Sequence, residues 1–286
     1  MTEIESSGWT CLSSVFACIF LTFGYVASLY VWGTKLNRDH PSVIKRRFFS
    51  VTCIMLVAPF YTNYFLSDET LSKGDLLAQL GIRASGLVAA SILPLILTAV
   101  LFLGPLTMQF LSGTWKLYAE PLYWISSWQD LIWVRNHFMA PLSEEWVFRA
   151  CMMPMLLQCL KPMTAVFMGP VLFGIAHFHH LFERINTGYN FQTALMISLF
   201  QFAYTSLFGA YSAYLFVRTG HVVAPLLAHI FCNHMGFPNF GEVNQYPPTQ
   251  RILIIFSFLL GFSIWCMYIS SMTNPDIYDN RLHWET

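Results

Sequence analysis

The feature that most constrains this chain is a series of long apolar segments separated by short polar ones. Hydrophobic residues make up 56% of its 286 residues and charged residues only 10%. A soluble domain carries about 25% charged residues, so this chain has too few charges to cover a globule in water. A helix that crosses a bilayer needs roughly 20 mostly apolar residues. The sequence therefore predicts an all-α protein that crosses a membrane several times.

Eight segments are candidate spans, and they cover residues 11–32, 48–66, 86–111, 142–158, 163–180, 192–217, 221–236 and 252–271. The fourth, fifth and seventh are the weakest by hydropathy because each contains ionisable groups. The first follows an acidic stretch without the basic region of a cleavable signal, so we expect it to be a span. We predict a polytopic integral membrane protein, a single domain over 1–286, with about eight transmembrane helices enclosing a polar cavity.

Charge outside the spans indicates an orientation. The first loop holds five basic residues, which are Lys35, Arg38, Lys45, Arg46 and Arg47. The positive-inside rule places such a loop in the cytosol, and with eight spans both termini would then face the lumen. The formal net charge of the chain is zero, so no basic field would attract nucleic acid.

The seven cysteines show no CxxC pair, and most lie in apolar runs. We interpret them as small apolar packing residues rather than a disulfide framework. The stretch 112–140 mixes tryptophan and tyrosine with charged residues. That mixture is typical of an amphipathic segment lying in the membrane interface, with a solvated loop as the alternative.

The first of three polar motifs is Glu144-Glu145 followed by Arg149, just after Pro141. Proline suits a first helical turn. Glu145 and Arg149 are four residues apart, so they share a helical face and can pair. Glu144 lies about 100° round the helix, and an unpaired carboxylate in an apolar setting is suited to act as a general base. The structural alternative is two acids at a helix start with a salt bridge.

The other two motifs place histidines in apolar segments. His177 follows Phe173 by four residues, and His229 precedes Asn233 by four. His229 and Asn233 would share a helical face and could both donate to a developing oxyanion. The alternatives are a hydrogen-bonded packing histidine and an interhelical clamp.

The spans place these motifs at one depth. Glu144 would lie at the start of the fourth span, His177 at the end of the fifth, and His229 in the second half of the seventh. Because consecutive spans run in opposite directions, all three positions fall at the same membrane face. Ionisable groups inside spans are costly and default to functional hypotheses.

In this order, EExxxR, FxxxH and HxxxN resemble the type II CAAX prenyl endopeptidases, which are glutamate-type intramembrane proteases of the CPBP or ABI family. The motifs cover a core of about 115–240. The resemblance implies an endoplasmic reticulum enzyme that removes the C-terminal aaX tripeptide from farnesylated or geranylgeranylated CAAX proteins such as Ras-type small GTPases. In the orientation that the first loop indicates, the face carrying the motifs is cytosolic, so the active site would open to the cytosolic side.

The resemblance also implies roles for single residues. Glu144 and His177 would activate water without a metal or other cofactor, and His229 with Asn233 would form the oxyanion hole. Glu145, Arg149 and Phe173 would support the site. A prenyl chain already resides in the lipid bilayer, so substrate could enter sideways from the membrane.

Other functions remain open from the sequence. A zinc protease would use histidine and glutamate ligands, although no HExxH motif is present. A cysteine protease would need an activated Cys151, which has no local base. A non-enzymatic scaffold or a transporter could also carry intramembrane polar residues.

Overall fold

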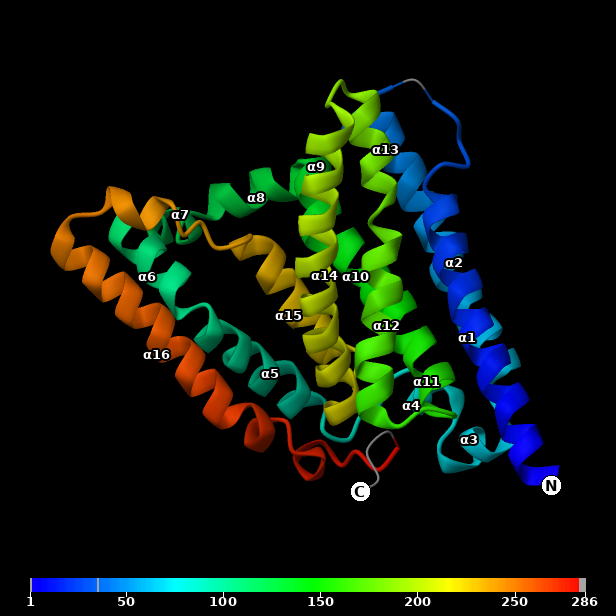
Figure 1. The fold of residues 1–286 in the computed structure, drawn as a ribbon. Coiled ribbons are helices and arrows are strands. Elements are labelled where there is room, and N and C mark those ends of the chain that lie inside the picture. The colour runs from blue at the N-terminus through cyan, green and yellow to red at the C-terminus, as the bar shows by residue number, and fades with distance from the viewer. Residues whose placement is uncertain (1, 35, 283–286) are drawn as a thin grey trace.

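The computed structural model describes residues 2–34 and 36–282 (Figure 1). Lys35 of the basic first loop lies outside the described residues. Every regular element in the described part of the chain is a helix. The longer helices are α1 (Thr2–Ser28), α2 (Pro41–Phe65), α5 (Leu87–Leu101), α6 (Leu103–Ser112), α12 (Pro162–Ala176), α14 (Phe191–Thr219), α15 (Val223–Met235) and α16 (Pro248–Met272).

Shorter elements connect them, and these are α3 (Asp68–Lys73), α4 (Leu76–Gln79), α7 (Trp115–Tyr118), α8 (Pro121–Gln129), α13 (His179–Asn186), η3 (Glu242–Gln245) and η4 (Pro275–Tyr278). A further run of adjoining pieces comprises α9 (Leu131–Val134), η1 (Arg135–Met139), α10 (Ala140–Glu145), η2 (Trp146–Cys151) and α11 (Met152–Leu157).

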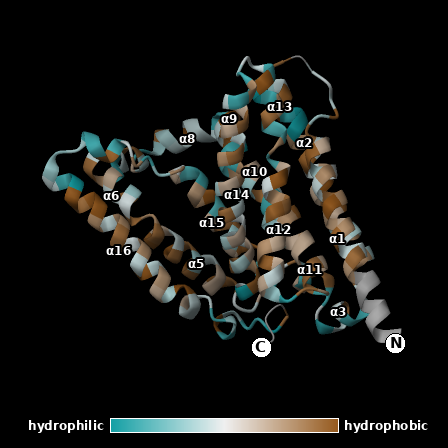
Figure 2. Cartoon of the chain, viewed as in Figure 1, coloured by the Kyte–Doolittle hydropathy of each residue, from teal (hydrophilic) through white to brown (hydrophobic). Residues whose placement is uncertain are grey.

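The predicted polytopic, all-α membrane architecture is confirmed. Among the described residues, five helical stretches are long and apolar enough to cross a membrane, and α5 with α6 makes a sixth if that pair, bent by 72°, counts as one span. Figure 2 shows hydrophobic residues along the outer helices, while hydrophilic residues gather at the ends, as in α13. The predicted spans at 142–158 and 221–236 are helical, but their helices are interrupted or short and do not qualify by length and composition.

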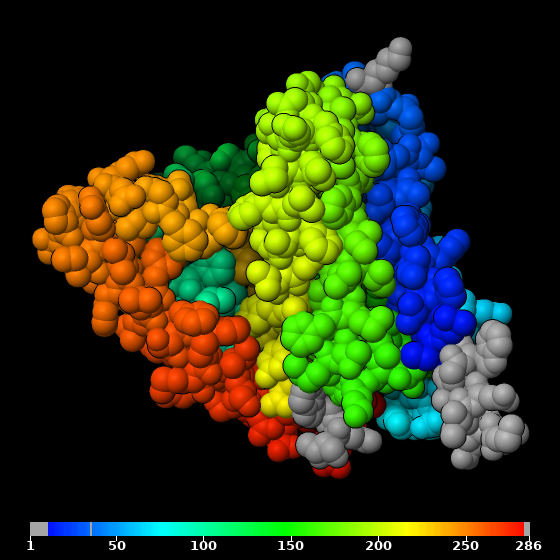
Figure 3. All heavy atoms as spheres, viewed as in Figure 1, coloured from blue at the N-terminus to red at the C-terminus, as the bar shows by residue number. Residues whose placement is uncertain are grey.

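The helices pack so that the run from α9 to α11 lies at the centre. Helix α12 packs along α14, α1 along α2, and α16 along α5 and α6, while α15 contacts α5, α14 and α10. In Figure 3 the molecular face is hollowed between α14 and α16, where the atoms of α5 and α6 lie deeper. The side chains of Val147–Met153 are at most 3% exposed, so this central run forms the protein core rather than a lipid-facing span.

The start of the central helix differs from the prediction. Pro141 was expected in the first helical turn, but helical structure already begins at Leu131. A π-helical turn precedes the proline, in which the Ala140 N–H donates to the Arg135 carbonyl. Proline removes one backbone donor, and a π-bulge can absorb such an irregularity, often at a functional site. Glu144 therefore lies inside a helical run rather than near its beginning.

The interpretation of the seven cysteines as packing residues was wrong for two that form a disulfide, and it is not supported for Cys53 and Cys266, which are exposed. Cys11 and Cys159 form a disulfide with their Cα atoms 5.1 Å apart. They are separated by 148 residues, so no local spacing could reveal the pair, and it is the packing of α1 against α11 that brings them together. Cys18 and Cys151 are free and buried, as predicted for packing residues.

The aromatic stretch at 112–140 forms the short helices α7, α8 and α9 together with η1, and Trp115, Trp124 and Trp128 are exposed. In Figure 1, α8 runs beside the upper part of α14, across the direction of that helix rather than along it. This arrangement suits a segment lying in the membrane interface, which stays a prediction.

A close approach between α12 and α14 depends on Gly209. A Cβ atom at this position would lie 2.9 Å from the Cβ of Pro170 and 3.2 Å from Nη2 of Arg149. Small residues let membrane helices approach closely where no hydrophobic driving force pulls them together. Gly209 thus lets α14 pack against both α12 and the central arginine.

We expect Gly209→Ala to lower the thermal stability of the detergent-solubilised protein. Overpacking of this kind costs about 1–3 kcal/mol, against a gain of about 0.5–1 kcal/mol from replacing a helical glycine by alanine. Gly24 in α1 is the matched control, because a Cβ there meets nothing within 4 Å. Gly24→Ala should be neutral or stabilising, and an equal response at both positions would show that the α12–α14 contact can relax freely.

Candidate active site

The centre of the site is Glu145, whose side chain has no exposed surface. Its Oε1 lies 3.2 Å from Nη1 of Arg149, one helical turn onward. The sequence spacing predicted this pair, and the structure confirms it. A buried carboxylate needs further partners, because desolvating an ion pair costs more than a single contact returns.

Two other helices supply those partners. Ser212 of α14 donates its hydroxyl to Oε2 of Glu145 at 2.5 Å, and Nδ1 of His229 on α15 lies 2.7 Å from Oε1. A carboxylate accepts hydrogen bonds, so Nδ1 of His229 carries the proton. Glu145 therefore joins α10, α14 and α15 through one side chain.

Arg149 is held from the opposite side. Its side chain is 1% exposed, and Nη2 donates to the Gly209 carbonyl at 3.3 Å. Its guanidinium carbon lies 4.5 Å from the centre of the Phe173 ring, a distance at which a cation and an aromatic face attract each other. Phe173, predicted only as a supporting residue of the FxxxH motif, thus contacts the buried cation.

Glu144 lies outside this ion pair, as the helical spacing predicted. Its side chain is 18% exposed, and its Oε2 lies 3.8 Å from Nε2 of His229. The carboxyl group lines a cavity that His177 also lines. The two adjacent glutamates therefore have different surroundings, one enclosed by partners and one facing open space.

His177 ends α12 and is oriented by its own helix. Its Nδ1 lies 2.8 Å from the Phe173 carbonyl oxygen. Because a carbonyl oxygen only accepts, Nδ1 carries the proton and Nε2 keeps its lone pair. The Phe173 ring lies against the imidazole, with ring centres 4.7 Å apart. A histidine fixed in this way can accept a proton at Nε2.

Asn233 lies one turn beyond His229 on α15, at an exposed position. Its Nδ2 donates to the backbone carbonyl of Asn136 in η1 at 2.8 Å. Asn136 lines the cavity, so the Asn233 amide is placed beside that space with one of its two N–H bonds already used. The three sequence motifs meet around Glu144, although neither His229 nor Asn233 is among the described residues lining the cavity itself.

Sequence reasoning missed several contributors to the site. Ser212 and Gly209 lie three residues apart on α14, and a row of small residues in an apolar helix was the one available signal for a close helix contact. Tyr25 of α1 also reaches the cavity and hydrogen-bonds Ser143 at 2.9 Å. No motif connects α1 with α10, so that contact required the folded chain.

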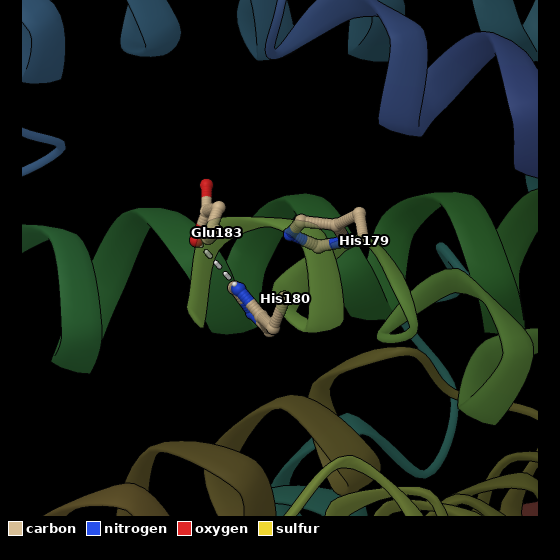
Figure 4. A group of neighbouring side chains, drawn as sticks. All are labelled: His179, His180 and Glu183. Carbon is tan, nitrogen blue, oxygen red and sulfur yellow. Dashed lines mark hydrogen bonds and ion pairs between the residues drawn. The ribbon is translucent and has the colours of Figure 1, made fainter. Parts of the chain in front are cut away.

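One group of possible metal ligands occurs among the described residues, and it comprises His179, His180 and Glu183. Figure 4 shows these three side chains together, with Glu183 paired to His180. Glu183 also lies 3.2 Å from the guanidinium nitrogens of both Arg38 and Arg47. Two cations on the only carboxylate oppose the binding of a third, so this group is a poor zinc site.

Cys151 does not fit the role of a nucleophile. It is the last residue of η2, and its side chain is fully buried in the hydrophobic core. A catalytic thiolate needs an accessible, electropositive setting. The structure therefore gives no support to the cysteine-protease alternative.

Comparison with known proteins supports the family that the motifs indicated. Residues 126–235 match the family model described as "Type II CAAX prenyl endopeptidase Rce1-like". The human protein named CAAX prenyl protease 2 is 42% identical over 95% of this chain and 84% of its own length. The rat protein of that name is 38% identical over 95% and 83%, and the Arabidopsis thaliana protein is 31% identical over 93% and 91%.

No solved structure matches this chain significantly. The relatives nevertheless agree in name across animals and a plant, and each match covers most of both sequences. Together with the three motifs that converge on Glu144, they show that this chain is a peptidase that belongs to the type II CAAX prenyl endopeptidase family.

Proposed function

We propose that Glu144 and His177 carry the reaction of this family, the removal of the C-terminal tripeptide from prenylated CAAX proteins, by activating a water molecule. The observation that carries this proposal is that both side chains line one cavity, while the neighbouring Glu145 is occupied by Arg149, Ser212 and His229. Glu144 is thus the carboxylate that faces open space in which a water can bind.

The reaction follows from the positions of the proton acceptors. A water between Glu144 and Nε2 of His177 gives up a proton as its oxygen bonds to the scissile carbonyl carbon. The C–N bond then breaks, and the proton passes to the nitrogen of the departing tripeptide. The Phe173 carbonyl holds His177 in the tautomer that leaves Nε2 free to accept.

We infer that His229 and Asn233 stabilise the oxyanion that forms in this step. Asn233 retains one amide N–H after its bond to the Asn136 carbonyl. Because Nδ1 of His229 already faces Glu145, the ring can donate from Nε2 only when it carries both protons. Donors fixed before the reaction stabilise developing charge without reorganisation.

The cavity also supports an orientation. Arg38 of the basic first loop and Arg47 of α2 line it, so the cavity opens at the face that carries this loop. By the positive-inside rule that face is cytosolic. We propose that the chain is a single domain of eight membrane crossings, with 142–158 and α15 completing the six candidate spans, and that it acts in the endoplasmic reticulum on prenylated proteins such as Ras-type small GTPases.

Metal dependence separates this mechanism from the zinc-protease alternative. A strong chelator such as phenanthroline should leave tripeptide release from a prenylated peptide largely intact, since a carboxylate and an imidazole perform the proton transfers. A specific loss of activity that added zinc restores would favour the metal mechanism. A non-chelating phenanthroline isomer is the matched control.

The two glutamates should separate activity from stability. Glu144→Gln should abolish cleavage, because the amide cannot take the proton, while protein abundance and melting temperature stay near normal. Glu145→Gln should lower the melting temperature, because removing one member of a buried ion pair leaves the other uncompensated, at a cost of about 3–5 kcal/mol.

A double variant tests the structural half of this division. Glu145→Leu combined with Arg149→Met removes both charges at similar volume, so it should recover part of the stability lost in Glu145→Gln. Equal and complete loss of activity in Glu144→Gln and Glu145→Gln, with stability unchanged in both, would contradict the division of roles.

The oxyanion donors should act mainly in the transition state. Removing one such donor typically lowers turnover by about a hundred- to a thousand-fold. His229→Ala and Asn233→Ala should therefore reduce kcat with nearly unchanged KM. The double variant should lose less than the product of the single losses, because both residues serve one charge.

His229 and Asn233 are expected to differ in their effect on the melting temperature. His229 also contacts Glu145, so His229→Ala should in addition lower the melting temperature, whereas Asn233→Ala at an exposed position should not. Full activity in both variants would mean that these residues only hold helices together and that the oxyanion donors lie elsewhere.

A further inference from the structure

Three arginines line the cavity that contains Glu144 and His177. They are Arg38 from the first loop, Arg47 from α2 and Arg135 from η1. These residues come from separate parts of the chain, and Glu144 is the only acid among the described residues that line the cavity. The cavity therefore has a carboxylate at the proposed reaction site and three guanidinium groups elsewhere along its wall.

Two acidic residues that do not themselves line the cavity form ion pairs with these three arginines. Glu183 lies 3.2 Å from Arg38 through one carboxylate oxygen and 3.2 Å from Arg47 through the other. Asp39 lies 2.7 Å from Arg135. A side chain held in this way has lost rotamer freedom before a ligand arrives, which lowers the entropy cost of binding.

Arg47 keeps donor capacity for a ligand. Its side chain is 15% exposed, and within the described part of the chain its buried Nε has no hydrogen-bond partner. A guanidinium has five N–H donors in a planar fork that matches a carboxylate bidentately. The buried Nε shows that the Arg47 guanidinium is incompletely paired, which is costly. A ligand can reach the exposed part of the side chain, which lines the cavity.

The reaction supplies an acceptor of the required chemistry. The substrate ends in a free carboxylate three residues beyond the scissile bond, and three extended residues span roughly 10 Å. That carboxylate therefore lies within roughly 10 Å of the scissile carbonyl when the substrate is bound. We propose that Arg47, flanked by Arg38 and Arg135, binds the C-terminal carboxylate of the substrate and thereby sets the cut three residues from the chain end; this rests on the function proposed above.

The substrate provides a direct test. Two prenylated peptides of one sequence, one with a free C-terminal carboxylate and one with a C-terminal amide, are compared as substrates of the wild-type enzyme. The amide removes the charge and keeps the size. Charge-assisted hydrogen bonds are worth enough that kcat/KM for the acid should exceed that for the amide by about 10- to 100-fold.

The same pair of substrates then tests Arg47. In Arg47→Gln the preference for the acid should fall to less than about three-fold, mainly through a higher KM for the acid, and Arg47→Lys should keep an intermediate preference because it lacks the fork. The ratio is measured within one preparation, so it does not depend on the fraction of enzyme that is folded.

Arg46 is the matched control. It neighbours Arg47 and carries the same charge, but it is exposed and lies 6.0 Å from the centre of the Trp32 ring rather than in the cavity lining. Arg46→Gln should keep the wild-type preference. An equal fall in both variants would indicate a general field of the basic loop and overturn a specific carboxylate site.

The outcomes distinguish this inference from the proposed function. If the wild type cleaves both peptides equally well, the carboxylate is not recognised, while the proteolytic function stands. If it cleaves neither peptide, the function itself fails. If the wild type prefers the acid and Arg47→Gln retains that preference, the carboxylate is bound by other residues and the assignment of Arg47 is wrong.

Discussion

A buried ion pair between Glu145 and Arg149 organises the centre of this protein. Both side chains are at most 1% exposed, so each depends on partners from other helices. Ser212 and the Gly209 carbonyl come from α14, and His229 comes from α15. Membrane helices gain little from hydrophobic association with one another. Polar contacts around one buried charge pair therefore hold α14 and α15 against the segment that carries Glu144.

This arrangement explains how two adjacent carboxylates come to have different surroundings. Consecutive residues on a helix point about 100° apart, so Glu145 faces the partner helices while Glu144 faces the cavity. His229 lies between them, 2.7 Å from Glu145 and 3.8 Å from Glu144. The Glu145–Arg149 pair thus positions the His229 ring beside Glu144, the proposed base. His229 therefore contributes both to the contact between helices and to the geometry proposed for the reaction.

Features that depend on local residue spacing and on composition could be predicted from the sequence. The i,i+4 relation gave the Glu145–Arg149 pair, and the alternation of span directions brought Glu144, His177 and His229 together. The sequence did not reveal where the central helix starts, because a π-helical turn before Pro141 continues the helix back to Leu131. Nor could it find the Cys11–Cys159 pair or the bond from Ser212, which depend on packing between segments far apart in the chain.

The basic first loop connects the topology of the chain with its chemistry. The positive-inside rule makes such residues determinants of orientation, yet Arg38 also lines the cavity with Glu144. A chain inserted the other way up would carry the cavity to the opposite face together with the loop. If Arg38 and Arg47 contribute to binding a substrate carboxylate, as proposed, the charges that orient the protein also draw the anionic end of the substrate to the same side. Insertion and substrate access would then be fixed together, because both depend on one set of cations.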